Sequence, residues 1–481
     1  MGAPDLPTIP EVHSTAGIAA VAITARLDAD GRPAFFWDGR EVAPTIRVRP
    51  GDVIRFHYEN DLPQTCGFGV VSDSNLHFHG FASEPVAPGD DVLSIAVRPG
   101  RTYDYVVKVP RDQPPGLYWY HPHPHGLTNW EIGNGMAGAI VVEGIADVDP
   151  AVAGLRERVI VLRDVPHDPG LGAALRPDPA KIVAGSHALR ITDEDDQYDA
   201  PCGVETTSQT TINGIPAATL GIEPGERQFW RVLNASAHRH FDLQAPGVPM
   251  QLVAQDGVPL RYYRGDATSE QRWHIIIPPG GRAEFVITGP KHPQMLYSLC
   301  FDTGPGGDEN PGAILGELDP EDSSALPRVP PPIGPAIPAR YETVPARVAR
   351  NRTITLSEGA HNRFFIDHVA YRPGLTPAVT AHSGTLERWT IENDSTEVHV
   401  FHLHQVHMVV ESINGRPNRE RAWIDVADVP PGKALAKGHI RPSRIVLLVD
   451  FRDPAARGVF PFHCHMADHE DNGMMATIRV I

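Results

Sequence analysis

The chain has 481 residues, of which 41% are hydrophobic, and a net charge of −17 at pH 7. This length predicts two to four domains with ordinary cores, and the acidic balance argues against nucleic acid or an anionic membrane as partner. No run of 18 apolar residues is present, so no membrane span is predicted. The 48 prolines and 44 glycines favour an all-β chain rich in turns.

One strand-like segment recurs three times along the chain. In each copy a turn glycine is followed nine residues later by asparagine, with alternating apolar and polar residues between them. The pairs are Gly51 and Asn60, Gly225 and Asn234, and Gly384 and Asn393. Because this period has the size of a domain, we predict three copies of one β-sandwich built from short strands. Three unrelated hairpins with the same turn chemistry are the alternative.

Composition indicates where the domains meet. The first domain is predicted to span residues 1–150 and the second residues 151–345. A proline-rich stretch at 326–338 is typical of a stiff, extended linker, so the third domain takes residues 346–481. The polar segment 172–200 is expected to be an irregular excursion at the surface.

Four His-x-His pairs follow one another along the chain. On a strand, side chains two residues apart point to the same face, so each pair presents two imidazoles together. Eight imidazoles exceed the needs of one four-coordinate zinc and predict a cluster of several metal ions. The pairs are His77 and His79, His121 and His123, His402 and His404, and His463 and His465. Two pairs fall in the first domain and two in the third, so these domains are expected to pack together.

Other histidines near these motifs are interpreted as supporting residues. His238 and His240 form a fifth pair in the second domain, which we interpret as a degenerate site without metal. His125 and His407 are expected to support the ligands or to lie at the surface.

The last of the four pairs encloses a cysteine. If the apolar strand at 459–462 continues, Cys464 faces away from both neighbouring histidines. His469 and Met474 follow closely, and His399 is the natural second imidazole. Two histidines, one cysteine and a weak methionine form a blue-copper electron-transfer site. One strand would then touch two metal sites.

With Cys464 as a ligand, three cysteines remain, which allow at most one disulfide. Cys202 and Cys300 are the expected pair because both fall in the middle third of the chain, and Cys66 is then the odd thiol. This count leaves the redox compartment undecided.

In this order and in three repeated domains, the four motifs resemble the multicopper oxidase family of the laccase type, and especially its bacterial three-domain branch. The resemblance covers essentially the whole chain. It implies three consecutive cupredoxin-like Greek-key β-sandwich domains and four copper ions. It assigns His399, Cys464, His469 and Met474 to the type 1 copper, His77 and His402 to the type 2 copper, and His79, His121, His123, His404, His463 and His465 to the type 3 pair.

Reduction of dioxygen consumes protons, so acids are needed near the cluster. Glu470 directly follows the proposed ligand His469. Asp90 or Asp91 comes shortly after the first histidine pair, and its spacing favours Asp90. In the family an acid next to the type 1 site occupies the place of Asp425.

The resemblance implies one-electron oxidation of phenols and aromatic amines, coupled to four-electron reduction of O2 to water. A cuprous or other metal-ion oxidase and a bilirubin oxidase stay open within the class, although the region 305–345 has no methionine. Outside the class, the alternative is a non-catalytic copper-binding protein of the cell envelope. The expected partners are a small reducing substrate and O2, and no oligomer is predicted.

The N-terminal residues have neither the basic nor the apolar segment of an export signal. The chain is therefore expected to be cytoplasmic, or to be a mature form from which a signal was removed. In the second case a periplasmic or secreted location is favoured.

Overall fold

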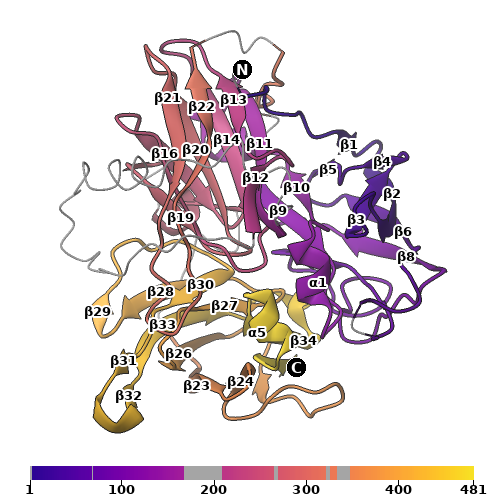
Figure 1. Ribbon diagram of the computed structural model, residues 1–481, viewed down its shortest axis with the longest axis vertical. Coiled ribbons are helices and arrows are strands. Elements are labelled where there is room, and N and C mark those ends of the chain that lie inside the picture. Colours follow the sequence, from indigo (N-terminus) through magenta and orange to yellow (C-terminus); the bar gives the residue numbers. More distant parts are fainter. Residues whose placement is uncertain (1–2, 68, 167–207, 265–268, 321–324, 333–346) are drawn as a thin grey trace.

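A computed structural model describes residues 3–67, 69–166, 208–264, 269–320, 325–332 and 347–481. This part of the chain is almost entirely strands, which form three β-sandwiches packed against one another (Figure 1). The all-β prediction with three consecutive sandwiches is therefore confirmed. None of the described helices has the length and apolar character needed to cross a bilayer. The boundaries at 150 and 345 stay predictions; the second, the segment 172–200 and Cys202 lie outside the described residues.

The first sandwich has two five-stranded sheets. The outer sheet has the order β4 (Arg40–Glu41), β3 (Pro33–Trp37), β2 (Ile18–Leu27), β6 (Val53–Asn60) and β8 (Arg101–Lys108). Buried and exposed side chains alternate along β2 and β6, as expected for a sheet with one face to water. The inner sheet has the order β1 (Glu11–His13), β5 (Thr45–Val48), β10 (Gly138–Val142), β9 (Gly116–His121) and β7 (His77–His79). The short helices α1 (Thr128–Gly133) and α2 (Ile145–Val148) flank β10.

The second sandwich covers the inner sheet of the first. One sheet has the order β12 (Ser208–Ile212), β11 (Arg156–Pro166), β14 (Arg227–Asn234), β20 (Arg282–Thr288), β16 (Met250–Gln255) and β17 (Val258–Pro259), with β18 (Glu270–Arg272) paired to β16. The other has the order β13 (Ala218–Gly221), β22 (Ala313–Asp319), β21 (Gln294–Leu299), β15 (Phe241–Gln244) and β19 (Ile275–Ile277), and α4 spans Arg261–Arg264. Trp119 and Val141 of the first sandwich pack against Val161 and Leu233, so β9 and β10 are buried on both faces.

The third sandwich repeats this plan. Its first sheet has the order β24 (Arg363–Ile366), β23 (Arg350–Gly359), β26 (Leu386–Asp394), β33 (Ser443–Asp450), β28 (Met408–Ile413) and β29 (Arg416–Pro417). Its second has the order β25 (Val379–Ala381), β35 (Met475–Val480), β34 (Gly458–Cys464), β27 (His399–Leu403) and β30 (Val426–Val429). A hairpin of β31 (Lys433–Ala434) and β32 (Ile440–Arg441) and the helix α5 (Ala467–Asp471) complete it.

The repeated segment becomes the same strand in each sandwich, namely β6, β14 and β26. Each follows a glycine with positive φ, and each contains an asparagine whose side chain holds the next loop. In the third copy, Asn393 Nδ2 donates to Glu397 O at 2.6 Å, and Asn393 Oδ1 accepts from Ser395 N at 3.0 Å. Asn60 and Asn234 accept in the same way from the residue two positions later. The Gly-to-Asn spacing thus marks a loop that the asparagine closes, not only a turn.

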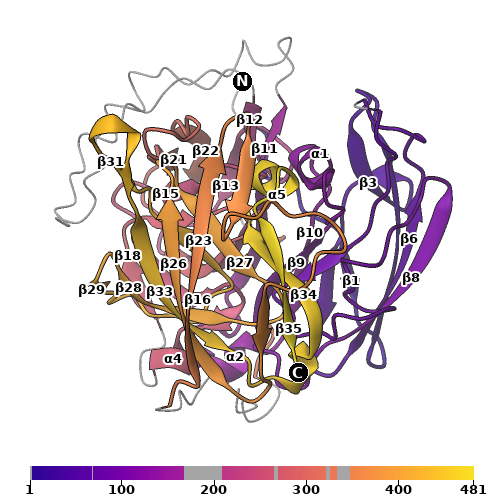
Figure 2. The ribbon, with the colours of Figure 1, turned by 90° about the horizontal axis from the view of Figure 1, so that it is seen from below.

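The first and third sandwiches also touch, as the histidine pairs predict. Helices α1 and α5 lie side by side (Figure 2). Asp471 in α5 accepts hydrogen bonds from Gly126 N at 2.7 Å and Asn129 N at 2.8 Å. The polypeptide from 126 to 129 is therefore held by the opposite domain, next to the histidine pair at 121 and 123.

Candidate metal centres

Strand pairing places the histidine pairs opposite one another. In the first sandwich, His77 on β7 lies opposite His121 on β9. In the third, His402 on β27 lies opposite His463 on β34, and Phe401 lies opposite Cys464. Because successive side chains alternate across a sheet, His463 and Cys464 leave the strand on opposite faces.

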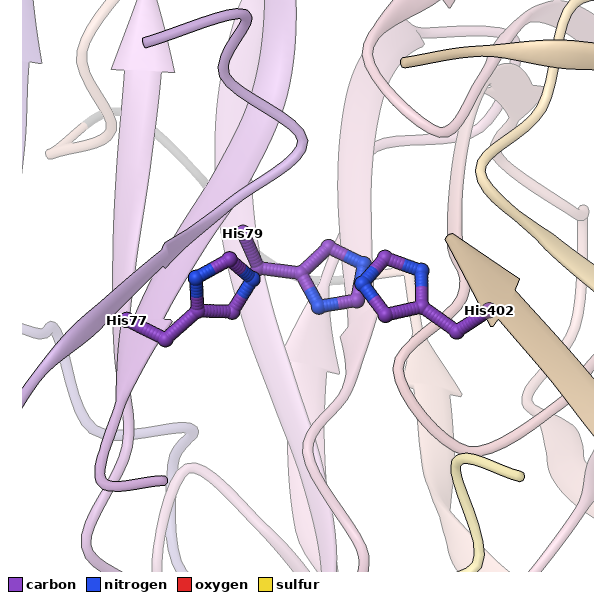
Figure 3. A group of neighbouring side chains, drawn as sticks. All are labelled: His77, His79 and His402. Atoms are coloured by element: carbon purple, nitrogen blue, oxygen red, sulfur yellow. The ribbon is translucent and has the colours of Figure 1, made fainter. Parts of the chain in front are cut away.

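The eight paired imidazoles gather between the first and third sandwiches. The ring centroids of His77 and His404 are 3.9 Å apart, and those of His79 and His402 are 4.0 Å apart. Ring nitrogens come within 4.8 Å of one another in three groups: His77, His79 and His402; His79, His121 and His465; and His123, His404 and His463. Figure 3 shows the first group, in which His77 and His79 extend towards His402 from the opposite side. Four motifs distant in sequence thus converge on one place.

The hydrogen bonds of these rings test whether metal ions fit. His77, His121 and His402 each donate an Nδ1–H, to the Asp90 carboxylate, Pro122 O and Asp425 O respectively. Their Nε2 atoms have no hydrogen-bond partner among the described residues. Such a bond fixes the tautomer and leaves the other nitrogen free for a metal. Because unpartnered buried polar atoms are costly, their convergence fits bound metal ions.

The protonation state of the cluster agrees with this fit. Burial, and after it the neighbouring imidazoles, hold the pKa values of His79, His121 and His463 well below the usual range. This shift favours the neutral form of these three rings, the form in which imidazole binds a metal.

Cys464 belongs to a separate group on the other face of β34. Its Sγ lies 3.8 Å from His399 Nδ1 and 3.6 Å from His469 Nδ1, and the two nitrogens are 3.2 Å apart. Ligands at about 2.0 Å (nitrogen) and about 2.3 Å (sulfur) in a trigonal plane would be about 3.5 to 3.8 Å apart. The three atoms therefore fit one ion. Burial raises the pKa of the Cys464 thiol, and a bound cation would reverse this by taking the thiolate as ligand.

Met474 is held next to this group through its backbone. Met474 O accepts from Cys464 N at 3.0 Å, and Met474 N donates to His469 O at 2.8 Å. The Met474 side chain is buried, and the Phe364 ring stacks on His469 with centroids 4.1 Å apart. The loop from 464 to 474 is thus closed by its own hydrogen bonds around the site.

Of the two aspartates proposed near the first histidine pair, Asp90 touches the cluster. Its carboxylate accepts from His77 Nδ1 at 3.0 Å, from Phe78 N at 3.0 Å and from Gln405 Nε2 at 2.7 Å. Asp91 is only partly buried, and its carboxylate accepts from Ser94 N.

Glu470 lies between two cluster histidines. Its Oε1 is 3.5 Å from His123 Nδ1, and its Oε2 is 3.4 Å from His463 Nδ1. The Thr128 hydroxyl donates to Glu470 Oε1 at 3.1 Å. Burial, assisted by the charge of Asp471, raises the pKa of Glu470 well above its usual range. These surroundings favour the protonated form of Glu470, the form that a proton donor requires.

Asp425 lies on the cluster side and not, as expected, beside the type 1 residues. Its carboxylate accepts from His79 Nε2 at 3.0 Å and pairs with Arg282. The cause is the antiparallel pairing of β27 with β30, in which Val426 lies opposite His402 and Val429 opposite His399. Asp425, which precedes Val426, therefore lies at the His402 end of β27.

The remaining histidines and cysteines occupy supporting places. His240 pairs with Asp428 at 2.9 Å, and His238 pairs with Asp468 at 2.9 Å. His125 packs against a tyrosine ring, and His407 is buried behind Asp425. Cys66 is a free, buried thiol, and Cys300 is disulfide-bonded.

Sequence reasoning missed three polar residues that support the proposed ligands. Arg282 forms an ion pair with Asp425, Gln405 donates a hydrogen bond to Asp90, and Thr128 donates one to Glu470. Gln405 directly follows His404, and its positive φ of 59° turns the chain sharply there. That adjacency was the only signal in the sequence; Arg282 and Thr128 had none.

A cavity of about 850 Å³ opens beside the mononuclear group, where α1, α5 and the second sandwich meet. Its wall includes Trp130, His238, Met466 and Asp468. Asp468 Oδ1 lies 3.9 Å from His469 Nε2. A molecule in this cavity would come within one side chain of the proposed type 1 ligands, at a volume typical of small-molecule sites.

Comparison with known proteins gives a consistent result. Three family models described as multicopper oxidase match residues 21–147, 187–312 and 344–481. The chain is 24% identical to a multicopper oxidase of Staphylococcus haemolyticus, covering 92% of this chain and 83% of the relative. It is 24% identical to a laccase of Haloferax volcanii, covering 96% and 81%. Its fold is similar to that of a multicopper oxidase of Campylobacter jejuni described as a metallo-oxidase, with a TM-score of 0.71, 20% identity, and coverage of 100% and 96%.

Proposed function

This chain belongs to the multicopper oxidase family, and we propose that it is a laccase-like oxidase of phenols and aromatic amines. The observation that carries the proposal is the two-sided strand β34. Cys464 lies in one group of candidate ligands, and its covalent neighbours His463 and His465 lie in the other. An electron accepted beside Cys464 therefore has a path of covalent bonds to the residues proposed to hold the O2 site.

The family binds four copper ions, which when bound supply one-electron oxidation at one site and reduction of O2 to water at another. The grouping of the ring nitrogens supports an assignment of each residue. We assign His399, Cys464, His469 and Met474 to type 1, His77 and His402 to type 2, and the triplets His79, His121, His465 and His123, His404, His463 to the type 3 pair.

We propose Glu470 as the proton donor and Asp90 as the acid that orients His77. Burial raises the pKa of Glu470, and its carboxyl lies close to two cluster histidines. Asp471 lines the cavity and accepts from Thr128 N at 3.2 Å, while the Thr128 hydroxyl donates to Glu470. The Thr128 hydroxyl is therefore the group in contact with Glu470 that could pass it a proton, whereas the backbone N–H that donates to Asp471 takes no part in such a transfer.

The cavity beside Asp468 supports a small organic donor. Trp130 and Met466 offer apolar surface, and Asp468 offers an acceptor for a phenolic or amine hydrogen. The positive charge of His238 compensates that carboxylate: although burial opposes it, Asp468 raises the pKa of His238 to about 9. A paired carboxylate attracts a bare cation less than a free one does, which favours a neutral donor here.

Metal-ion oxidation is the second candidate, favoured by two other acids. Glu358 Oε1 lies 3.4 Å from His399 Nε2, and Glu397 Oε2 lies 3.6 Å from His469 Nε2. These two acids stand beside the imidazoles, where a cation could give up an electron. Burial, and after it the charge of Glu358, raises the pKa of Glu397 to about 9, so a cation would have to displace its proton. The Campylobacter relative is itself described as a metallo-oxidase.

The deciding experiment measures O2 consumption by the copper-loaded protein with a phenol, an aromatic amine, bilirubin, Cu(I) and Mn(II). The laccase proposal expects the highest kcat/KM for the phenol or the amine. A protein that oxidises only metal ions would replace it with the second candidate. A protein that stays colourless after copper loading would contradict both.

Glu358→Gln and Glu397→Gln separate the two candidates further. If a metal cation docks against these carboxylates, each change should lower kcat/KM for the metal ion by about tenfold, which corresponds to about 1.4 kcal/mol. Turnover of a neutral phenol should respond much less. An equal loss for both donors would mean that the acids support the histidines and do not bind a substrate.

A further inference from the structure

We infer that Arg282, in the second sandwich, is a positioning residue for the trinuclear cluster: it fixes the Asp425 carboxylate, which in turn fixes the ring of His79. The second sandwich supplies none of the twelve residues that we assign to copper. The inference rests on that assignment, and it extends the cluster's support to a domain without proposed ligands.

Arg282 is fully buried at the start of β20 and holds Asp425 with a two-pronged ion pair. Its Nη1 donates to Asp425 Oδ1 at 2.7 Å, and its Nη2 donates to Asp425 Oδ2 at 2.6 Å. The guanidinium is itself anchored, since Nε donates to Leu117 O at 3.1 Å and Nη1 to Gly280 O at 3.0 Å. A planar guanidinium bound at both prongs sets the plane of the carboxylate, which a lysine ammonium cannot do.

Asp425 passes this constraint on to one histidine of the first sandwich and one of the third. Its Oδ1 accepts from His79 Nε2 at 3.0 Å, and its backbone oxygen accepts from His402 Nδ1 at 2.7 Å. Because Nε2 of His79 is engaged, its Nδ1 faces the cluster, and that atom has no hydrogen-bond partner among the described residues. The Asp425 carboxylate therefore decides which nitrogen of His79 is offered to a metal.

A second acid locks Arg282 and Asp425 together through their backbones. Asp256 Oδ1 accepts from Arg282 N at 2.8 Å, and Asp256 Oδ2 accepts from Asp425 N at 3.1 Å. Asp256 lies between β16 and β17 of the second sandwich, and Asp425 lies in the third. These two hydrogen bonds tie the second and third sandwiches together at the point where the ion pair forms.

The backbone of Gly80 packs closely against the guanidinium and the carboxylate. Gly80 directly follows His79 and has a φ of 87°; a Cβ there would be 2.7 Å from Arg282 Nη2 and 2.8 Å from Asp425 Oδ2. Gly280, which precedes β20, approaches the cluster equally closely, since its Cβ would be 2.8 Å from the His465 ring. Gly80 of the first sandwich and Gly280 of the second thus mark two points near the cluster where only glycine fits.

The test compares Arg282→Lys with Arg231→Lys. Both arginines are fully buried in adjacent strands of the same sheet, both carry a charge at a domain interface, and both pair with two acids. Arg231 pairs with Glu157 and Glu284, and within the described part of the chain it forms no ion pair or hydrogen bond with a histidine. Its variant therefore reports the cost of disturbing an interface alone.

In Arg282→Lys we expect a 10- to 100-fold loss of copper affinity at the cluster or of turnover, as for other residues that orient metal ligands. Copper per chain should fall while the blue absorbance per chain is retained. In an anaerobic mixture the donor should bleach the blue colour at the wild-type rate, and reoxidation by O2 should slow. The KM for the donor should not change, so the loss should appear in kcat. Arg231→Lys should retain wild-type values in all these measurements.

Arg282→Met removes the charge as well and leaves Asp425 buried without its partner, so it should lose more cluster copper than the lysine variant. Wild-type copper content and reoxidation in Arg282→Lys would overturn the inference. So would an equal loss in Arg231→Lys, or a parallel loss of blue absorbance, because each indicates a general structural role. If the wild-type protein does not take up four coppers, it is the proposed function that fails, independently of Arg282.

Discussion

Replacing Glu157 with glutamine should uncouple the first two sandwiches more than any exposed ion pair could. The Glu157 carboxylate stands between two arginines across the domain interface. Its Oε2 accepts from Arg47 Nη2 at 2.5 Å, and its Oε1 accepts from Arg231 Nε. The side-chain exposures of Glu157, Arg47 and Arg231 are 1%, 5% and 0%. Water therefore cannot reach the arginines to solvate the charge that loses its partner.

The magnitude follows from this burial. Removing one partner of a buried ion pair costs about 3–5 kcal/mol, because the remaining charge stays desolvated. Arg231 keeps Glu284, and Arg47 keeps Glu143 and Glu11. We therefore expect the lower end of this range, about 3 kcal/mol. Glutamine preserves shape, so the loss comes from charge and not from a cavity.

Glu411→Gln is the matched control. It makes the same substitution in a two-pronged pair with Arg388, whose side chain is 40% exposed. Exposed pairs contribute at most about 1 kcal/mol. Calorimetry should show the first unfolding transition lowered by about 6–12 °C for Glu157→Gln and by no more than about 4 °C for the control, at about 2–4 °C per kcal/mol. Equal shifts in the two variants would refute the argument.

The same variant has a predictable dependence on pH. Although burial opposes it, Arg231 and Arg47 lower the pKa of Glu157 below its usual range. A carboxyl whose pKa is lower in the folded state contributes stability above its unfolded pKa of about 4.3, and this contribution is lost as pH falls through the folded value. The difference between wild type and Glu157→Gln should thus be full at pH 6 and should shrink below about pH 4. A constant difference would contradict the charge-based account.

Three further predictions concern the metal centres. Glu470→Gln should lower kcat by about 10²- to 10⁴-fold with the donor KM unchanged, because the buried acid can no longer supply protons; steady-state O2 consumption checks this, and unchanged turnover would remove Glu470 from the proton path. Asp90→Asn should lower cluster copper or turnover by about 10- to 100-fold, whereas Asp91→Asn should not, since only Asp90 contacts His77; equal effects in copper analysis and turnover would contradict the choice. Cys464→Ser should abolish the blue colour and remove one copper per chain while leaving three, because the cluster ligands are a separate set; elemental analysis that finds loss of all four would contradict the separation.

Much of this arrangement could be predicted from sequence because strand geometry converts spacing into direction. His463 and His465 on one face and Cys464 on the other follow from alternation alone, and the structure has the same division. The four pairs are expected to converge because each offers two imidazoles and one metal cluster can bind them together. In each case local geometry and residue type carry the information.

What could not be predicted depends on pairing between distant strands. Asp425 falls at the His402 end of β27 because β30 runs antiparallel to it, and one sequence does not reveal that register. Arg282 lies 143 residues from Asp425 and is an ordinary arginine at the start of a strand. Its role exists only once three sandwiches are assembled, so no local pattern marks it.

The second sandwich therefore explains how two half-sets of ligands from separate domains are held at a fixed distance. Between the first and second sandwiches, Trp119, Val141 and the Glu157 ion pairs form a buried interface. Between the second and third sandwiches, a buried apolar cluster that includes Tyr262 and Trp423 does the same. A movement of the first sandwich relative to the third would therefore disturb one of these two buried interfaces. The mononuclear ligands need no such support, because all four come from the third sandwich.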